Sequence, residues 1–318
     1  AIGMVRVTQV AVLEEFNLFL LISDKTLVAY HLDAICPNER TGTVSDSARK
    51  APQKLSGSKD VGFFVTGKQK DRTLVFYKKR DNLNSVFKVL EPVYQKSSEK
   101  KRGMFKRGTT EFFREFDEFY IPTECTAMNL FHSSLAVSTA RGFEVLTLDK
   151  KQPFSVPELK AEHVQNIAQH IKDQRALSML RLSDQEFLLC YQNFAVYVNK
   201  HGDVSRSVIM QFVGSAQNAA LYGPYLVLFD NDFVEIRNAQ NGRLKQIIAG
   251  REVKCLDDGT NWSANAEPAS THGANGDHKV PTTASLTSSR TLKLVMQHPE
   301  MDKTQIVVEL VLNENMKD

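Results

Sequence analysis

Residues 62–69, GFFVTGKQ, come close to a motif that does chemistry. They match the phosphate-binding loop G-x-x-x-x-G-K-[ST] up to its last position, with Lys68 in the place of the phosphate-binding lysine. That loop needs a hydroxyl after the lysine to hold Mg²⁺, and a helix whose N-terminus faces the phosphate. Gln69 supplies no hydroxyl, and residues 63–65 are strand formers. We therefore predict a β-hairpin here and no nucleotide site.

Other residues have side chains that can bind metals or act as nucleophiles. The turn Asp230-Asn231-Asp232 lacks the glycine and the downstream glutamate of a calcium loop, so we interpret it as an Asx turn. His163 and His170 are two helical turns apart on a predicted helix, too far for joint metal binding. The four cysteines include no Cys-x-x-Cys pair, and neither G-x-S-x-G nor G-x-G-x-x-G occurs. We predict no catalytic residue, no metal and no cofactor.

A strongly basic loop at residues 95–110, QKSSEKKRGMFKRGTT, is the most suggestive binding feature. Its cationic side chains are Lys96, Lys100, Lys101, Arg102, Lys106 and Arg107. Near an anionic lipid leaflet, each such residue contributes about 1 kcal/mol to membrane binding. Phosphorylation of Ser97 or Ser98 would cancel part of that charge. We predict that the basic loop helps a larger protein dock at the cytoplasmic face of a membrane; a solvated loop without a binding role is the alternative.

The bulk composition is that of an ordinary globular protein. Of 318 residues, 42% are apolar and 24% are charged, which suffices for a sizeable core. A net charge of +3 is too small for a nucleic-acid-binding domain, which needs a basic stripe. Cysteines without a disulfide pattern indicate a reducing, cytoplasmic compartment. No apolar run reaches the roughly 18 residues that span a bilayer, and the first residues lack the core of a signal peptide.

One pattern recurs along the chain: a short apolar strand, a polar turn and a second apolar strand. Valine, leucine, phenylalanine and tyrosine dominate the strands, and Gly, Asn, Asp or Lys fill the turns, which is typical of β-hairpins. Six hairpins are expected at residues 18–22 and 26–31, 62–66 and 73–77, 135–138 and 143–148, 187–191 and 194–199, 225–229 and 233–237, and 291–296 and 304–312. Weaker strands are expected at residues 8–13, 86–90, 127–131, 208–212 and 244–248.

The spacing of these hairpins predicts an all-β, seven-bladed WD40-like β-propeller that forms one domain over residues 1–318. The longer intervals contain the basic loop and a polar insertion at residues 257–289, which we expect to be disordered. A two-sheet sandwich is the rival fold, but the hairpins are too many for one. With six hairpins clear, the seventh blade is expected to be incomplete or built from the termini. A helix at residues 159–173, capped by Ser155 and Glu158, is expected between blades.

Several stretches of sequence, taken in chain order, carry a resemblance to a known family. They are LFLLISDKTLVAYHLDAI (residues 18–35), AVSTARGFEVLTLD (136–149), EFLLCYQNFAVYVNKHGDVSR (186–206), YLVLFDNDFVEIRNAQNG (225–242), IIAGREVKCL (247–256) and HPEMDKTQIVVELVLNE (298–314). Together they resemble the citron homology (CNH) domain of fungal Rho-family guanine nucleotide exchange factors, and the resemblance covers nearly the whole chain. The kinase members and the vacuolar tethering factors of that family look more distant.

The resemblance implies a non-catalytic, regulatory role within a larger exchange factor whose catalytic domain lies elsewhere. The implied partners are a Rho-family small GTPase, an upstream sensor or other domains of the same protein. The implied context is cell-wall-integrity and polarity signalling, with recruitment from the cytoplasm to the plasma membrane or cell cortex at sites of polarised growth. Two alternatives stay open: a membrane-tethering module of the vacuolar sorting type, and a propeller hydrolase built from side chains that converge from distant blades.

Overall fold

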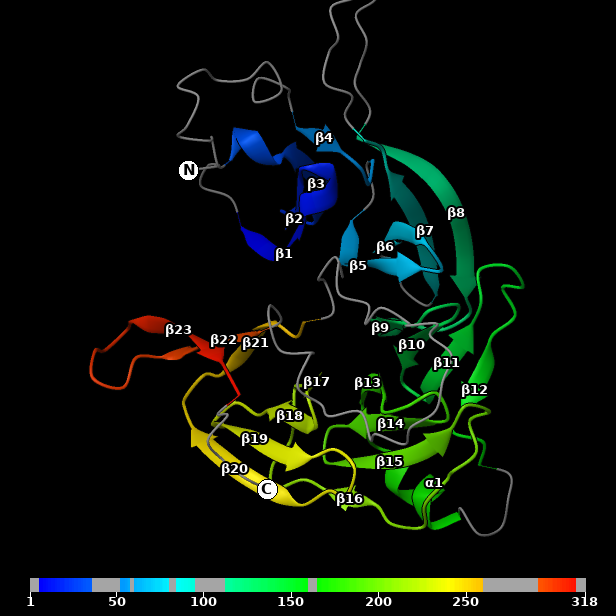
Figure 1. The fold of residues 1–318 in the computed structure, drawn as a ribbon, viewed down its shortest axis with the longest axis vertical. Coiled ribbons are helices and arrows are strands. Elements are labelled where there is room, and N and C mark those ends of the chain that lie inside the picture. The colour runs from blue at the N-terminus through cyan, green and yellow to red at the C-terminus, as the bar shows by residue number, and fades with distance from the viewer. Residues whose placement is uncertain are drawn as a thin grey trace, which may run out of the picture. The chain divides into compact units, whose positions relative to one another are not determined.

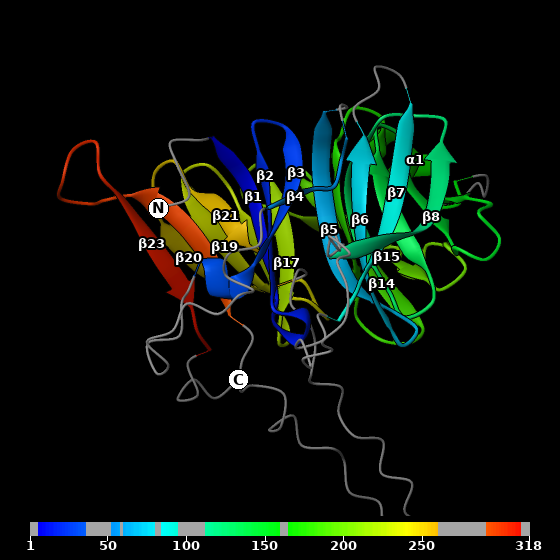
Figure 2. The same ribbon diagram turned by 90° about the horizontal axis from the view of Figure 1, so that it is seen from above.

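The strands of this chain form six antiparallel sheets in the computed structural model, which describes residues 6–35, 52–57, 60–79, 84–94, 112–159, 165–259 and 291–312. In every sheet each strand pairs with the strand that precedes or follows it in the chain, which is the meander of a propeller blade. Figure 2 shows this order clearly for β5 to β8, whose strands lie side by side. The chain is thus an all-β protein of the propeller type with blades of three or four strands.

The chain divides into two compact units, and the first comprises residues 1–139, 144–154 and 260–263. Blade 1 consists of β1 (Val7–Leu13), β2 (Leu18–Ser23), β3 (Thr26–His31) and β4 (Gln53–Lys54), with short 3-10 helices at Glu14–Phe16 and Leu32–Ala34. Blade 2 consists of β5 (Val61–Gln69), β6 (Arg72–Lys79), β7 (Ser85–Pro92) and β8 (Phe113–Ile121). Blade 3, most of which belongs to this unit, consists of β9 (Cys125–Leu130), β10 (Leu135–Thr139), β11 (Gly142–Leu146) and β12 (Phe154–Val156).

The second unit comprises residues 140–143, 155–259 and 264–318. Blade 4 consists of β13 (Ala176–Arg181), β14 (Glu186–Tyr191), β15 (Phe194–Asn199) and β16 (Met210–Gln211), and helix α1 (Gln165–Ile171) precedes it. Blade 5 consists of β17 (Asn218–Tyr222), β18 (Tyr225–Phe229), β19 (Phe233–Asn238) and β20 (Leu244–Ala249). Blade 6 has three strands, β21 (Lys254–Asp257), β22 (Leu292–Gln297) and β23 (Gln305–Leu310).

Within the first unit, apolar side chains fill the spaces between neighbouring blades. One cluster joins blade 1 to blade 2 and includes Leu20 and Phe64, both fully buried. The next joins blade 2 to blade 3, where the rings of Phe87 and Phe119 stack with centroids 5.0 Å apart and Met128 packs against them from β9. Because side chains alternate along a strand, every blade in the middle of such a stack has two apolar faces.

The second unit is built in the same way. Leu188 and Tyr197 of blade 4 pack against Leu226 of blade 5, and Val227 on the opposite face of β18 packs against Leu294 of blade 6. Neighbouring residues 226 and 227 thus serve different interfaces, as the two-residue period of a strand requires. This stacking places blades 4 and 5 against each other and fixes the loops at their ends.

The structure confirms the six predicted hairpins, which appear as β2–β3, β5–β6, β10–β11, β14–β15, β18–β19 and β22–β23. The weaker predicted strands appear as β1, β7, β9, β16 and β20, although β16 is shorter than expected. Six strands were not predicted: β4, β8, β12, β13, β17 and β21. Among the described residues there are six sheets, and the count of seven blades stays a prediction.

The predicted capping of the helix is wrong. Ser155 lies in β12, which pairs with β11, so it extends blade 3 and does not begin a helix. The described helix α1 starts at Gln165, and the buried side chains of Ile167 and Ile171 lie one turn apart on its inner face. The polar insertion predicted at residues 257–289 falls largely outside the described residues.

Candidate functional site

The segment that resembled a phosphate-binding loop is a strand, as predicted. Residues 62–69 lie in β5, and a tight turn leads from them directly into β6. The side chain of Gln69, at the position of the missing hydroxyl, is buried and donates hydrogen bonds to the carbonyls of Phe131 (2.6 Å) and Ser134 (3.0 Å). Gln69 therefore ties blade 2 to the β9–β10 turn of blade 3.

The Asp230–Asp232 turn is an Asx turn, as predicted. The amide of Asp232 donates to Oδ1 of Asp230 at 3.1 Å, and the amide of Ser215 donates to its Oδ2 at 2.7 Å. Both carboxylate oxygens are thus bound by backbone amides. No group of three or more potential metal ligands is found in the part of the chain that the structure describes. Of the two histidines considered, His163 lies outside that part, and His170 contacts the carbonyl of Asn166 in its own helix at 2.8 Å.

The described cysteines are free thiols; Cys125 and Cys190 are buried and Cys255 is half-buried. Burial raises the pKa of Cys125 to about 11, and burial also raises the pKa of Cys190 and Cys255. At neutral pH these side chains are therefore protonated, and a protonated thiol is a poor nucleophile. They fill space in the sheets, as expected for a small apolar residue.

The six cations of the basic loop, Lys96, Lys100, Lys101, Arg102, Lys106 and Arg107, lie outside the described residues. No helix among the described residues is both long enough and apolar enough to cross a lipid bilayer.

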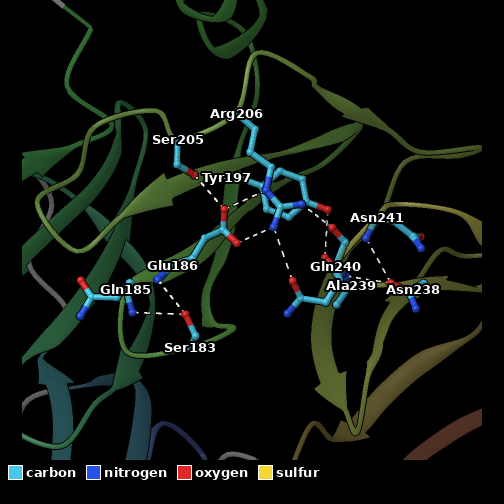
Figure 3. A network of polar contacts seen from close by, with 10 residues as sticks. All are labelled: Ser183, Gln185, Glu186, Tyr197, Ser205, Arg206, Asn238, Ala239, Gln240 and Asn241. Atoms are coloured by element: carbon cyan, nitrogen blue, oxygen red, sulfur yellow. Dashed lines mark hydrogen bonds and ion pairs between the residues drawn. The ribbon is translucent and has the colours of Figure 1, made fainter.

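The structure instead brings together a polar network that joins blade 4 to blade 5, and Arg206 is at its centre (Figure 3). Its guanidinium donates from Nε to Oε1 of Glu186 at 2.8 Å, and Nη2 donates to the other carboxylate oxygen. It lies over the ring of Tyr197, 3.9 Å from the centroid. On the other side it donates to the main-chain carbonyl of Gln240 in the β19–β20 loop. Ser205 adds a hydrogen bond to Oε1 of Glu186 at 3.0 Å.

Local structure on the blade 4 side holds the carboxylate in place. The hydroxyl of Ser183 accepts the amides of Gln185 (3.2 Å) and Glu186 (3.1 Å), which closes the turn before β14. Glu186 is the first residue of β14 and pairs in register with Asn199, the last residue of β15. Tyr197 lies two residues earlier on β15, and its hydroxyl donates to the carbonyl of Ala239 in blade 5 at 2.9 Å.

On the blade 5 side, the β19–β20 loop presents the carbonyls that receive these donors. The side-chain oxygen of Asn238 accepts the amides of Gln240 (2.9 Å) and Asn241 (3.1 Å), which is the local bonding typical of Asn in turns. Gly242 has φ +73°, and a Cβ there would lie 3.2 Å from Cγ of Met210 in β16. A glycine is therefore needed both for the turn and for the close approach of the two blades.

The charges in this network stabilise each other. The hydrogen bond from Arg206 is the main cause that lowers the pKa of Glu186, against a smaller opposing effect of burial, and the same bond raises the pKa of Arg206. Burial raises the pKa of Tyr197. At neutral pH the network therefore holds a carboxylate, a guanidinium and a neutral phenol. With its carboxylate already occupied, the arrangement is suited to joining the two blades.

Replacing Glu186 with glutamine is expected to lower the free energy of unfolding by about 1 kcal/mol at pH 7. Because the folded-state pKa of Glu186 is lowered, the ion pair contributes above the unfolded pKa of about 4.3 and is lost as the pH falls through the folded pKa. The difference between the two proteins should thus shrink on acidification below about pH 4.3, as measured by urea unfolding at a series of pH values. Glu300→Gln, an exposed carboxylate without an ion pair among the described residues, is the control; a Glu186→Gln difference independent of pH would contradict the prediction.

Sequence reasoning missed this network. Residues 186–206 stood out as a family-like segment, but Glu186 and Arg206 are 20 positions apart and Gln240 is 34 positions further on. A usable signal was present: Glu186 opens the first strand of a hairpin and Arg206 follows the second, which puts both at the same end of the blade. What no pattern indicated is that the loop of the next blade comes within hydrogen-bonding distance.

A comparison with protein-family models matches residues 1–259 to the CNH domain. The chain belongs to the CNH domain family. A CNH domain is a non-catalytic module, which agrees with a site whose ionisable groups are paired with one another. The solved structure of the AfRom2 CNH domain shares the fold, with a TM-score of 0.69 and 26% identity over 96% of this chain and 81% of that one.

Fungal exchange factors are among the curated relatives of this CNH domain. Rho1 guanine nucleotide exchange factor 1 of Schizosaccharomyces pombe is 34% identical over 81% of this chain and 19% of its own length. RHO1 GDP-GTP exchange protein 2 of Saccharomyces cerevisiae is 26% identical over 80% of this chain and 18% of its own length. The chain thus spans about a fifth of the length of the relatives that it matches.

Proposed function

We propose that this CNH domain is the regulatory, protein-binding part of a Rho guanine nucleotide exchange factor. The observation that carries the proposal is the match of four fifths of the chain to exchange factors for Rho1 from two yeasts. Catalysis is assigned to another part of such a protein. The stacked blades support a binding role, because a rigid propeller offers its loops as a preformed docking surface at little entropic cost.

The partner proposed first is a Rho-family GTPase; an upstream sensor or other domains of the exchange factor are further candidates. The cellular context proposed is cell-wall-integrity and polarity signalling, with a cytoplasmic protein recruited to the plasma membrane or cell cortex. The basic loop at residues 95–110 is proposed to assist that recruitment, because its six cations favour an anionic leaflet.

The immobilised domain is expected to retain a Rho1-type GTPase from solution in a pull-down, with different yields for the GTP-loaded and GDP-loaded forms. The domain alone should not accelerate release of a fluorescent GDP analogue from the same GTPase. A Ras-type GTPase is the control for specificity.

If neither the GTP-loaded nor the GDP-loaded GTPase is retained by the domain, the GTPase is not its partner. Accelerated nucleotide release would contradict the regulatory assignment. Co-sedimentation with anionic liposomes tests the membrane role independently. The domain with and without residues 96–107 is compared, and equal binding of the two forms would contradict a membrane role for the basic loop.

We extend the proposal to the fold, in which a seventh blade would stack on blade 6. Ile306 and Val308 of β23 pack towards blade 5, so the alternation of the strand turns Val307 and Val311 to the other face. Both are exposed, by 67% and 70%, although the end of a stack is normally polar. Amides of β23 should exchange more slowly in a complete exchange factor than in this chain; equal exchange would contradict the seventh blade.

A further inference from the structure

Four large apolar side chains lie exposed where the outer strands of blades 4 and 5 meet. They are Val208 (67% exposed), Val213 (60%), Leu244 (47%) and Ile247 (42%), and we call them the edge patch. Val208 and Val213 flank β16, the last strand of blade 4, while Leu244 and Ile247 belong to β20, the last strand of blade 5. An exposed apolar patch that spans two elements is a typical protein-binding feature.

Contacts between the two blades bring together the elements that carry the edge patch. Before β16, Arg206 donates to the carbonyl of Gln240 (Figure 3). After β16, the amide of Val213 donates to Oε2 of Glu235 at 2.9 Å. Glu235 pairs in register with Ile247, so their side chains share one face of the sheet. Val213 and Ile247 therefore lie on the same side.

Leu244 joins the same side of the sheet through its register. It pairs with Arg237, two residues along β19 from Glu235, so the alternation of the strand gives Leu244 and Ile247 a common face. The guanidinium of Arg237 bonds to the carboxylate of Glu235 and to the carbonyl of Gly242 at 2.8 Å, which holds the turn before β20 in place. The ion pair between Arg237 and Glu235 thus holds the backbone that carries Leu244.

The backbone of β20 makes this patch suited to an extended ligand. Among the described residues β20 pairs with β19 on one edge, and no strand pairs with its other edge. Almost every side chain of β20 is exposed. An open strand edge next to apolar side chains binds a further strand through main-chain hydrogen bonds, and the side chains that point to one face supply the specificity.

The charge at this edge selects the ligand. Arg243 and Lys245 are exposed at the start of β20, and a register shift between Arg237 and Ile236 places Lys245 in a bulge, which re-aims its side chain. The nearby carboxylate of Glu235 is buried and bound to Arg237 and Val213. At the other end of β20, Arg251 is followed by Glu252, so Arg243 is the cation on which the preference for an acidic ligand rests.

We propose that β20 and the edge patch bind an extended segment of another protein in which apolar side chains alternate with acidic ones. The apolar side chains cover Leu244 and Ile247, while the acidic ones face Arg243 at the start of the strand. The inference does not depend on the proposed GTPase partner, because it rests on the edge, the patch and the charge alone.

A fluorescent peptide of alternating glutamate and valine, eight residues long by design, is the probe, and its lysine–valine counterpart is the charge control. By fluorescence anisotropy the wild-type domain should bind the acidic peptide about tenfold more tightly than the basic one. Ile247→Glu should weaken acidic-peptide binding by about tenfold or more. Met301→Glu, at an exposed methionine in the β22–β23 turn, should leave it unchanged.

Two further readouts make the result decisive. Bound acidic peptide should slow amide exchange in β20, and the variant Arg243→Glu should lose the preference for the acidic peptide. No binding of the acidic peptide at about 1 mM, equal binding by Ile247→Glu, or protection elsewhere with β20 unchanged would each overturn the proposal. Retention of the GTPase by Ile247→Glu would show that the two binding roles are separate and leave the regulatory proposal intact.

Discussion

Replacing Arg206 with alanine is expected to lower the free energy of unfolding by about 2–3 kcal/mol. The substitution removes the two bonds to Glu186, the stacking on Tyr197 and the bond to the carbonyl of Gln240. It also leaves the carboxylate of Glu186, which is only 21% exposed, without its cation. Chemical denaturation measures the loss, and amide exchange at residues 238–243 should accelerate because the loop of blade 5 loses its contact with blade 4.

Two variants test whether geometry or charge matters in the Arg206 network. Arg206→Lys keeps the charge but loses the planar fork and the stacking, so it should be intermediate. Arg243→Ala removes an exposed arginine of the same loop that donates no side-chain hydrogen bond among the described residues, and it should change stability by less than about 0.5 kcal/mol. Equal effects of Arg206→Ala and Arg243→Ala would contradict the role given to the network.

Replacing Phe87 with alanine is expected to have the largest effect, a loss of about 3–5 kcal/mol. Phe87 is fully buried between blades 2 and 3, stacks on Phe119 and contacts Phe63 edge-on at 6.0 Å between centroids. The cavity left behind would have strands on both sides that cannot collapse without losing their register. Chemical denaturation and near-ultraviolet circular dichroism, which reports the stacked rings, would measure the effect.

The comparison for Phe87 is a phenylalanine on the same blade. Phe116 in β8 is 38% exposed and lies beneath the guanidinium of Arg72, 5.4 Å from the ring centroid. Phe116→Ala should cost less than about 1 kcal/mol, because little apolar surface is returned to water. A Phe87→Ala protein as stable as Phe116→Ala would show that the space between blades 2 and 3 is not closely packed.

The hairpins were predictable because their chemistry is local. In β14 and β15 an unbroken apolar run, a polar turn and a second apolar run predict two buried strands, and the structure pairs these strands with each other. Strand β8, FREFDEFYI, was not predicted because its many charged residues obscure the alternation of apolar and polar side chains. Those charges are stabilised by a neighbouring strand: Lys88 of β7 lies 2.6 Å from Glu118. A pairing of that kind depends on which strand lies alongside.

The candidate site was harder to predict from the sequence than the strands were. Of the residues with a familiar chemical pattern, Lys68 lies exposed in β5, and Asp230 accepts backbone amides. Arg206 has no motif of its own, and its importance comes from a contact between two blades that only their stacking creates. Family resemblance gave the family correctly, since it relies on the whole pattern of strands.

The pairing of β7 with β8 has a consequence for how this family can evolve. Pro92 and Phe113 are register partners, as are Ser85 and Ile121, so the sheet closes fully although about twenty residues separate the two strands. The entropic cost of closing such a connection rises by only about 0.6 kcal/mol for each doubling of its length. Relatives can therefore gain or lose residues between these strands at little thermodynamic cost, and natural selection can vary the connection while blade 2 stays intact.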